Sequence, residues 1–218
     1  MTSFPGAPAL LKGGIVLIDA QTAAVQRVIP LQYNPESLTR SIEPQMVQPE
    51  GGDRAELLRF KGPPNETITI EAEIDATDQL ERPDRFPDVV QVGIYAKLAA
   101  LETSVSAASA ALVANNLLAA AGGLEILPIE GPLTLFVWSR RRVLPVRITQ
   151  LGVTEDAFDP SLNPLRAKVN LTMRVLSVND LPFAHKGSSL FLAYLQQKEQ
   201  LAAGQTAALG TLGITGIP

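Results

Sequence analysis

Alternation between apolar and polar residues marks the clearest predicted strand of the chain. In residues 66–75, apolar side chains fall on one face of an extended backbone and Thr and Glu side chains fall on the other. Successive side chains of a strand point to opposite faces. The segment therefore predicts a strand with one exposed and one buried face, and the buried side chains are Ile68, Ile70, Ala72 and Ile74.

Short apolar runs rich in β-branched residues predict further strands. They cover residues 14–19, 25–33, 133–138, 143–154 and 167–175. Short connections between the first two runs and between the next two indicate hairpins. By contrast, residues 41–59 are polar and contain two prolines and two glycines, which predicts a surface loop.

Apolar residues change to helical spacing in residues 84–104, where Pro87 suits a first helical turn. The Ala-rich residues 106–121 predict a second helical segment that Gly122 and Gly123 end. Residues 190–203 predict a helix near the C-terminus, followed by a Gly- and Thr-rich tail that frays.

The predicted order of elements is not the regular strand–helix alternation of a parallel sheet. It predicts an α+β, mainly β fold: an antiparallel barrel or sandwich with a flanking helix. We expect three parts, namely an N-terminal arm (residues 1–13), a β domain (residues 14–181) with a helical insertion at about 84–123, and a C-terminal helix and tail (residues 182–218).

The amino-acid composition limits the kinds of chemical site that the chain can form. The 218 residues include no Cys and one His, which excludes disulfides, thiolate metal sites and multi-histidine metal sites. The net charge of −4 argues against a general nucleic-acid binder. Only 18% of residues are charged, below the usual value of about 25%, so we expect much of the surface to meet other protein.

No catalytic motif accompanies these elements. The sequence lacks the nucleophile-elbow, phosphate-loop, dinucleotide and paired-histidine zinc patterns. The single His185 has no nucleophile or orienting acid signalled beside it, and the acidic run from Asp75 to Asp88 lacks the order of a calcium loop. We expect no enzyme activity, no cofactor and no metal site.

The ends and the most apolar segment indicate a protein made in the cytosol. Residues 1–11 lack the basic and apolar regions of a secretory signal. Residues 105–123 are mostly Ala and are interrupted by Ser and Asn, so they fall short of the roughly 20 strongly apolar residues of a membrane span. We expect no membrane insertion.

The only basic cluster is Arg140–Arg142, at the predicted tip of a hairpin. Arginine is preferred at protein interfaces and pairs with carboxylates through two hydrogen bonds. The cluster is either a contact with an acidic partner surface or a solubilising turn. Trp138 ends the preceding strand and is expected to pack on the sheet.

Two segments resemble the tube-protein-like N-terminal domain of baseplate proteins from contractile injection systems, which are phage-tail-like particles. The first is IPLQYNPESL (residues 29–38). The second begins with LTLFVW (residues 133–138), the Arg140–Arg142 tip and VLPVRI (residues 143–148). It continues with TEDAFD (residues 154–159) and LNPLRA (residues 162–167).

The resemblance, which covers about residues 14–181, implies a non-enzymatic subunit of a six-fold ring. Such rings join the inner tube and the spike or hub to the baseplate wedges, in a particle that is assembled in the bacterial cytoplasm and kept there or released. Longer relatives carry a peptidoglycan-binding LysM module, for which the residues after Leu181 are too few and too poor in strands. Alternatives are a tube or tube-initiator subunit of the same particle and, ranked lower, a cell-wall-binding module. The candidate interface residues are Arg140, Arg141, Arg142, Tyr33, Asn34, Pro35, Asp159 and Asn163.

Overall fold

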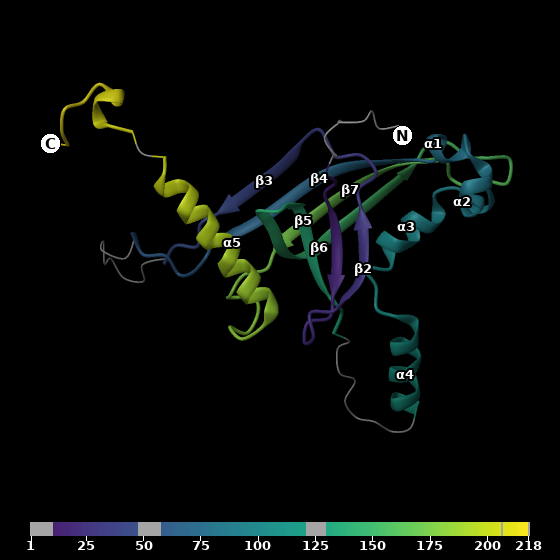
Figure 1. Ribbon diagram of the computed structural model, residues 1–218. Coiled ribbons are helices and arrows are strands. Elements are labelled where there is room, and N and C mark those ends of the chain that lie inside the picture. The colour runs from purple at the N-terminus through teal and green to yellow at the C-terminus, as the bar shows by residue number, and fades with distance from the viewer. Residues whose placement is uncertain (1–10, 48–57, 121–129, 206, 218) are drawn as a thin grey trace.

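One antiparallel sheet of seven strands dominates the computed structural model, which describes residues 11–47, 58–120, 130–205 and 207–217. The strand order is β2-β1-β5-β6-β7-β4-β3, and every neighbouring pair is antiparallel. A few helices accompany the sheet, so the α+β, mainly β class is confirmed (Figure 1). The strands are β1 (Gly14–Ile18), β2 (Val25–Pro30), β3 (Leu38–Glu43), β4 (Asn65–Asp75), β5 (Leu133–Ser139), β6 (Arg142–Glu155) and β7 (Arg166–Val175).

The sheet curls around its main core. In Figure 1, β1 and β2 run steeply across the direction of β3, β4 and β7. One hydrophobic cluster contains Ile15 of β1, Phe136 of β5 and Met173 of β7, together with the inward side chains of β4. Strands far apart in the strand order therefore share one core, because the curl brings their inner faces together.

Helices close the two sides of this core. Helix α5 (Lys186–Ala203) contributes Phe191 and Tyr194, and helix α3 (Tyr95–Glu102) contributes Leu98 and Leu101. The short elements α1 (Thr77–Leu80), η2 (Pro83–Arg85) and α2 (Pro87–Val92) connect β4 to α3. Helix α4 (Ser109–Ala120) projects away from the sheet, and η3 (Leu209–Leu212) lies apart from the sheet near the C-terminus (Figure 1).

Two sequence expectations were wrong in part. Residues 41–43 belong to strand β3 and not to a loop, because β4 supplies backbone partners from Asn65 to Ile70 along a polar edge strand. The helix predicted over residues 84–104 is broken at Gly93, whose φ is +59°. A Cβ at Gly93 would lie 2.1 Å from the carbonyl oxygen of Pro164, so this close approach requires glycine. The helix ending predicted at Gly122 and Gly123 lies outside the described residues.

A buried carboxylate ties the β3 edge to α5. Glu66 is only 3% exposed. Its carboxylate accepts hydrogen bonds from Arg40 of β3 at 2.7 Å and from Lys198 of α5 at 3.2 Å. Arg40 also donates to the hydroxyl of Tyr194, and the Lys198 ammonium lies 4.5 Å from the centre of that ring. Removal of one partner from such a group leaves a buried charge unpaired, which is costly.

Replacement of Ile70 by Asp is expected to unfold the protein. Ile70 is 1% exposed in the main core, and an unpaired carboxylate there costs about 4 kcal/mol or more. The matched control is Thr69→Asp, because Thr69 is the next residue of β4 and faces solvent. Thermal melts followed by circular dichroism should show a folded Thr69→Asp protein and no cooperative transition for Ile70→Asp. A normal melt for Ile70→Asp would contradict the strand register.

Candidate assembly interface

The sheet has two edges that carry exposed apolar side chains. Strand β2 pairs only with β1 and exposes Val25 (62%) and Val28 (59%). Strand β3 pairs only with β4 and exposes Ile42 (47%). Within the described part of the chain, no strand covers either edge. An open edge offers unpaired backbone groups to another strand, so both edges are candidate contact surfaces.

The Arg140–Arg142 tip forms as predicted. Arg140 and Arg141 make the turn between β5 and β6, and Arg142 begins β6. All three residues are exposed, and none of them forms an ion pair with a described residue. Trp138 is partly buried and stacks on Phe136, with ring centres 5.9 Å apart, so its expected packing on the sheet is also present.

Residues 33–35 connect β2 to β3 and have partners within the chain. The Asn34 side chain accepts a hydrogen bond from the Gly13 amide at 3.0 Å and donates to the Leu11 carbonyl at 2.8 Å. The Tyr33 hydroxyl lies 3.4 Å from a carboxylate oxygen of Asp78 in α1. Asn34 thus fixes the start of β1, while the Tyr33 ring remains 39% exposed.

Asp159 organises the loop between β6 and β7. Its carboxylate accepts hydrogen bonds from the amides of Ser161 (2.7 Å) and Asn163 (2.8 Å) and from the Asn163 side chain (2.8 Å). These bonds, those from Asn163 first, hold the pKa of Asp159 below its usual value of 3.8. The Asn163 side chain also donates to the carbonyl of Gln91, which ties the loop to α2.

The predicted interface residues fall into three places. Asp159 and Asn163 bond to each other directly, and residues 33–35 are adjacent in the chain. Both groups attach to the α1–α2 region, through Asp78 and Gln91 respectively. No hydrogen bond or ion pair among the described residues joins the Arg140–Arg142 tip to either group.

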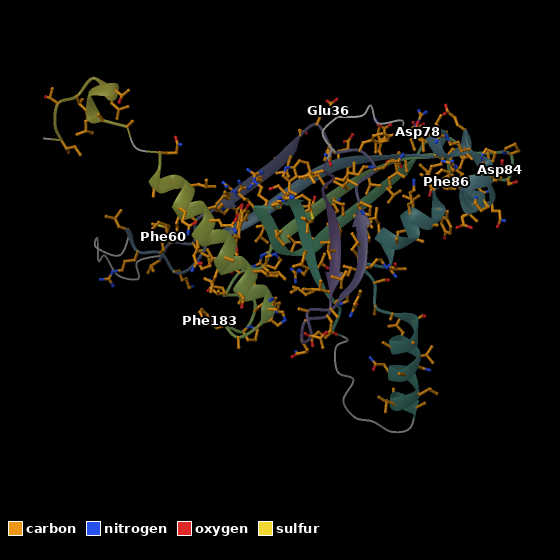
Figure 2. All side chains as sticks on the ribbon, viewed as in Figure 1. Glu36, Phe60, Asp78, Asp84, Phe86 and Phe183 are labelled. Carbon is orange, nitrogen blue, oxygen red and sulfur yellow. The ribbon has the colours of Figure 1, made fainter. Side chains whose placement is uncertain are left out.

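Other exposed apolar surfaces were not among the sequence candidates. Helix α4 has no buried residue, and its side chains Leu112, Val113, Leu117 and Leu118 are all more than half exposed. Phe60 (71% exposed) and Phe183 (73% exposed) lie on the side of the molecule where α5 lies, whereas Asp78, Asp84 and Phe86 lie at the opposite end (Figure 2). Such aromatic and aliphatic groups are typical of surfaces that partners cover.

His185 has a structural role. It precedes the first residue of α5, and its Nδ1 accepts a hydrogen bond from the Gly187 amide at 3.0 Å. This bond satisfies one of the amides that a helix leaves unpaired at its start. In the described ranges, no group of three or more His, Cys, Asp or Glu residues is arranged to hold a metal ion. None of the helices described there combines the length and the apolar character needed to cross a membrane.

Two structurally important polar residues were missed from the sequence. Glu66 shares the even-numbered positions of Ile68 and Ile70, so the alternation itself places it on the buried face. Gln32 follows β2, and its side chain bonds to both backbone groups of Asp75 at the end of β4. No local pattern in the sequence signals the Gln32 contact, because its two ends are 43 residues apart.

No family model matches this chain, and no curated protein matches it.

Asp159 is expected to stabilise the protein only when ionised. Since its pKa is lowered in the folded state, its contribution is complete above the unfolded-state value of about 3.8 and is lost as the pH falls through the lower folded-state value. The melting temperature of the wild type should exceed that of Asp159→Asn at pH 7, and the difference should shrink below pH 4. Asp84→Asn is the control at an exposed acid whose carboxylate accepts no hydrogen bond from another described residue. A difference between wild type and Asp159→Asn that does not change with pH would contradict the role of the charge.

Charge reversal at the Arg140–Arg142 tip is expected to block assembly and to leave the isolated chain folded. The three side chains are exposed at a turn, so their replacement by Glu removes no described ion pair. Size-exclusion chromatography with light scattering measures assembly, and circular dichroism checks the fold. The matched control reverses the exposed Arg82, Arg85 and Arg147, which changes the net charge equally. Equal assembly of both variants would reject the tip as a contact.

Proposed function

We propose that this protein is a structural subunit of the baseplate of a contractile injection system. In this proposal, six copies form a ring that joins the inner tube and spike to the surrounding baseplate. The observation that carries the proposal is the pair of open sheet edges, β2 and β3, at opposite ends of the strand order. A head-to-tail contact between two different edges repeats around an axis and generates a ring when its rotation closes.

The sequence resemblance in residues 29–38 and 133–167 indicates the kind of particle to which the protein belongs, and the fold is compatible with a subunit of such a particle. The tail-tube type of fold that the resemblance implies is built from the same kinds of element, a curled antiparallel sheet with helices at its sides. The uncharged, exposed α4 and the aromatic side chains of Phe60 and Phe183 supply further surface for neighbouring subunits. Such a subunit has a mechanical role and uses no catalytic group.

A tube or tube-initiator subunit is the second candidate, and one surface favours it. The outward face of β4 and β7 carries exposed polar side chains, including Thr69, Glu71 and Asn170, and no described helix contributes to a core on that side of these strands. A polar sheet face of this kind suits the lumen of a tube. Helix α4 argues against a uniform tube wall, because it stands off the sheet and would obstruct close stacking of identical rings.

Deletion of the gene is expected to abolish assembled tube-and-sheath particles, which electron microscopy of particle preparations measures. Mass fractions in wild-type particles should give about six copies for a single ring and many more for a tube. Normal particles in the deletion strain would contradict both candidates.

Complementation of that strain tests the sheet edges directly. A Val28→Lys, Ile42→Lys double variant places charge on both edges and should fail to restore particles, because lysine opposes strand addition. The control is Val90→Lys, at a similarly exposed valine (48%) of α2, which should restore them. Full rescue by the double variant would show that the edges are not the contacts.

A further inference from the structure

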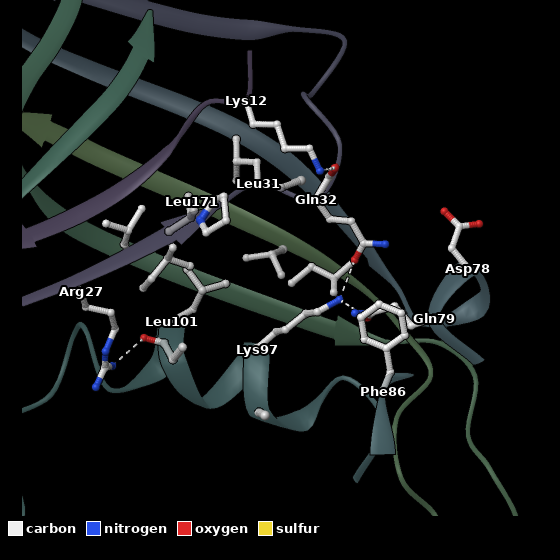
Figure 3. A pocket seen from close by; sticks show the side chains of 18 of the residues that line it. Lys12, Arg27, Leu31, Gln32, Asp78, Gln79, Phe86, Lys97, Leu101 and Leu171 are labelled. Carbon is white, nitrogen blue, oxygen red and sulfur yellow. Dashed lines mark hydrogen bonds between the residues drawn. The ribbon is translucent and has the colours of Figure 1, made fainter. Parts of the chain in front are cut away.

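A cleft opens where the curled sheet fails to close on itself. Its volume is about 810 Å³, a size typical of small-molecule sites. Strand β2 and the two residues that follow it form one wall, the inner faces of β4 and β7 form the floor, and α3 forms the opposite wall. Figure 3 shows the apolar side chains of Leu31, Leu101 and Leu171 gathered on one side of the Lys97 side chain.

Lys97 brings a positive charge into this cleft, and no described residue forms an ion pair with it. Its ammonium donates to the side-chain oxygens of Gln32 at 3.0 Å and Gln79 at 2.6 Å, both of them neutral groups. Two of its three donors are thereby used. Burial, and then repulsion by Lys12, lower the pKa of Lys97, while the charge of Asp75 acts in the opposite direction.

A second cation stands beside the first. Lys12 donates to the backbone carbonyl of Gln32 at 2.9 Å, so Lys12 and Lys97 both bind atoms of one residue. Neither lysine forms an ion pair with any described residue. An anion that bridges the two ammonium groups would offset their repulsion and would use the remaining donors. The whole lining of the cleft also carries a net positive charge. It contains five basic side chains and two acidic ones: Lys12, Arg27, Arg82, Arg85 and Lys97 against Asp78 and Glu81.

We propose that the cleft binds a single-chain amphiphilic carboxylate of the fatty-acid class. The carboxylate oxygens lie between Lys97 and Lys12, and the hydrocarbon chain covers Leu31, Leu101 and Leu171. Two lysine donors match the two oxygens of a carboxylate, and charge-assisted hydrogen bonds of this kind are the stronger ones. A small hydrophilic anion, by contrast, would leave the apolar floor of the cleft uncovered. Strand β2 is both a wall of this cleft and a proposed ring edge, but binding is measured on the isolated chain, so the two proposals can fail separately.

The test uses the purified full chain and a fluorescent fatty acid, 11-(dansylamino)undecanoic acid, displaced by laurate or by the neutral 1-dodecanol. We expect saturable binding of one probe per chain and displacement by laurate at a concentration at least about tenfold lower than by dodecanol. Lys97→Met should weaken binding about tenfold, whereas Lys61→Met, at an exposed lysine outside the cleft, should leave it unchanged.

A second variant distinguishes loss of binding from loss of folding. Ala100 lines the cleft on α3, and Ala100→Trp should fill part of it and reduce binding, with a circular dichroism spectrum like that of the wild type. The proposal is overturned by the absence of saturable binding, by equal displacement by laurate and dodecanol, or by unchanged affinity in folded Lys97→Met.

Discussion

A single side chain joins the β2 edge of the curled sheet to strand β4. The Gln32 amide donates to the carbonyl of Asp75 at 2.6 Å and accepts from the Asp75 amide at 3.2 Å. Gln32 follows β2, Asp75 ends β4, and four strands separate β2 from β4 in the sheet order. The side-chain amide therefore supplies the two hydrogen bonds that a neighbouring strand would otherwise make. Since Lys97 binds the same Gln32 oxygen, this contact also positions α3 and sets one wall of the cleft.

The Glu66 cluster has a matching role at the other side of the core. Arg40 of β3 and Lys198 of α5 bind one carboxylate, so the edge strand and the last long helix are held to β4 by the same buried group. Buried ion pairs contribute little net stability but penalise arrangements that leave a charge unpaired. The β3 edge is thus fixed in position by a specific pairing, although its own outward residues are polar and exposed.

Local patterns in the sequence predict most of the strands and helices, but not the contacts between distant segments that curl the sheet and form the cleft. Alternation identified β4 and β7, and apolar runs identified β1, β5 and β6, because each strand buries one or both faces in the core. Strand β3 escaped prediction because its partner, β4, and not its own apolar content, makes it extended. The break at Gly93 depends on contact with Pro164, 71 residues away, and the cleft depends on the Gln32–Asp75 contact. Of the interface candidates, the Arg140–Arg142 tip was predicted as a turn, while the internal bonds of Asp159 and Asn34 required coordinates.

The direction of the edge strands constrains how copies can meet. Six antiparallel pairings separate β2 from β3, and because this number is even, both edges run the same way through the sheet. A two-fold contact of β3 with another β3 would be antiparallel and would close as a dimer. A head-to-tail contact would instead join β3 of one copy to β2 of the next in the parallel sense, which is slightly less stable per residue. In the proposed ring, side-chain contacts beside the strands would add to this pairing, and the exposed Phe60 and Phe183 on the side where α5 lies are available to supply them.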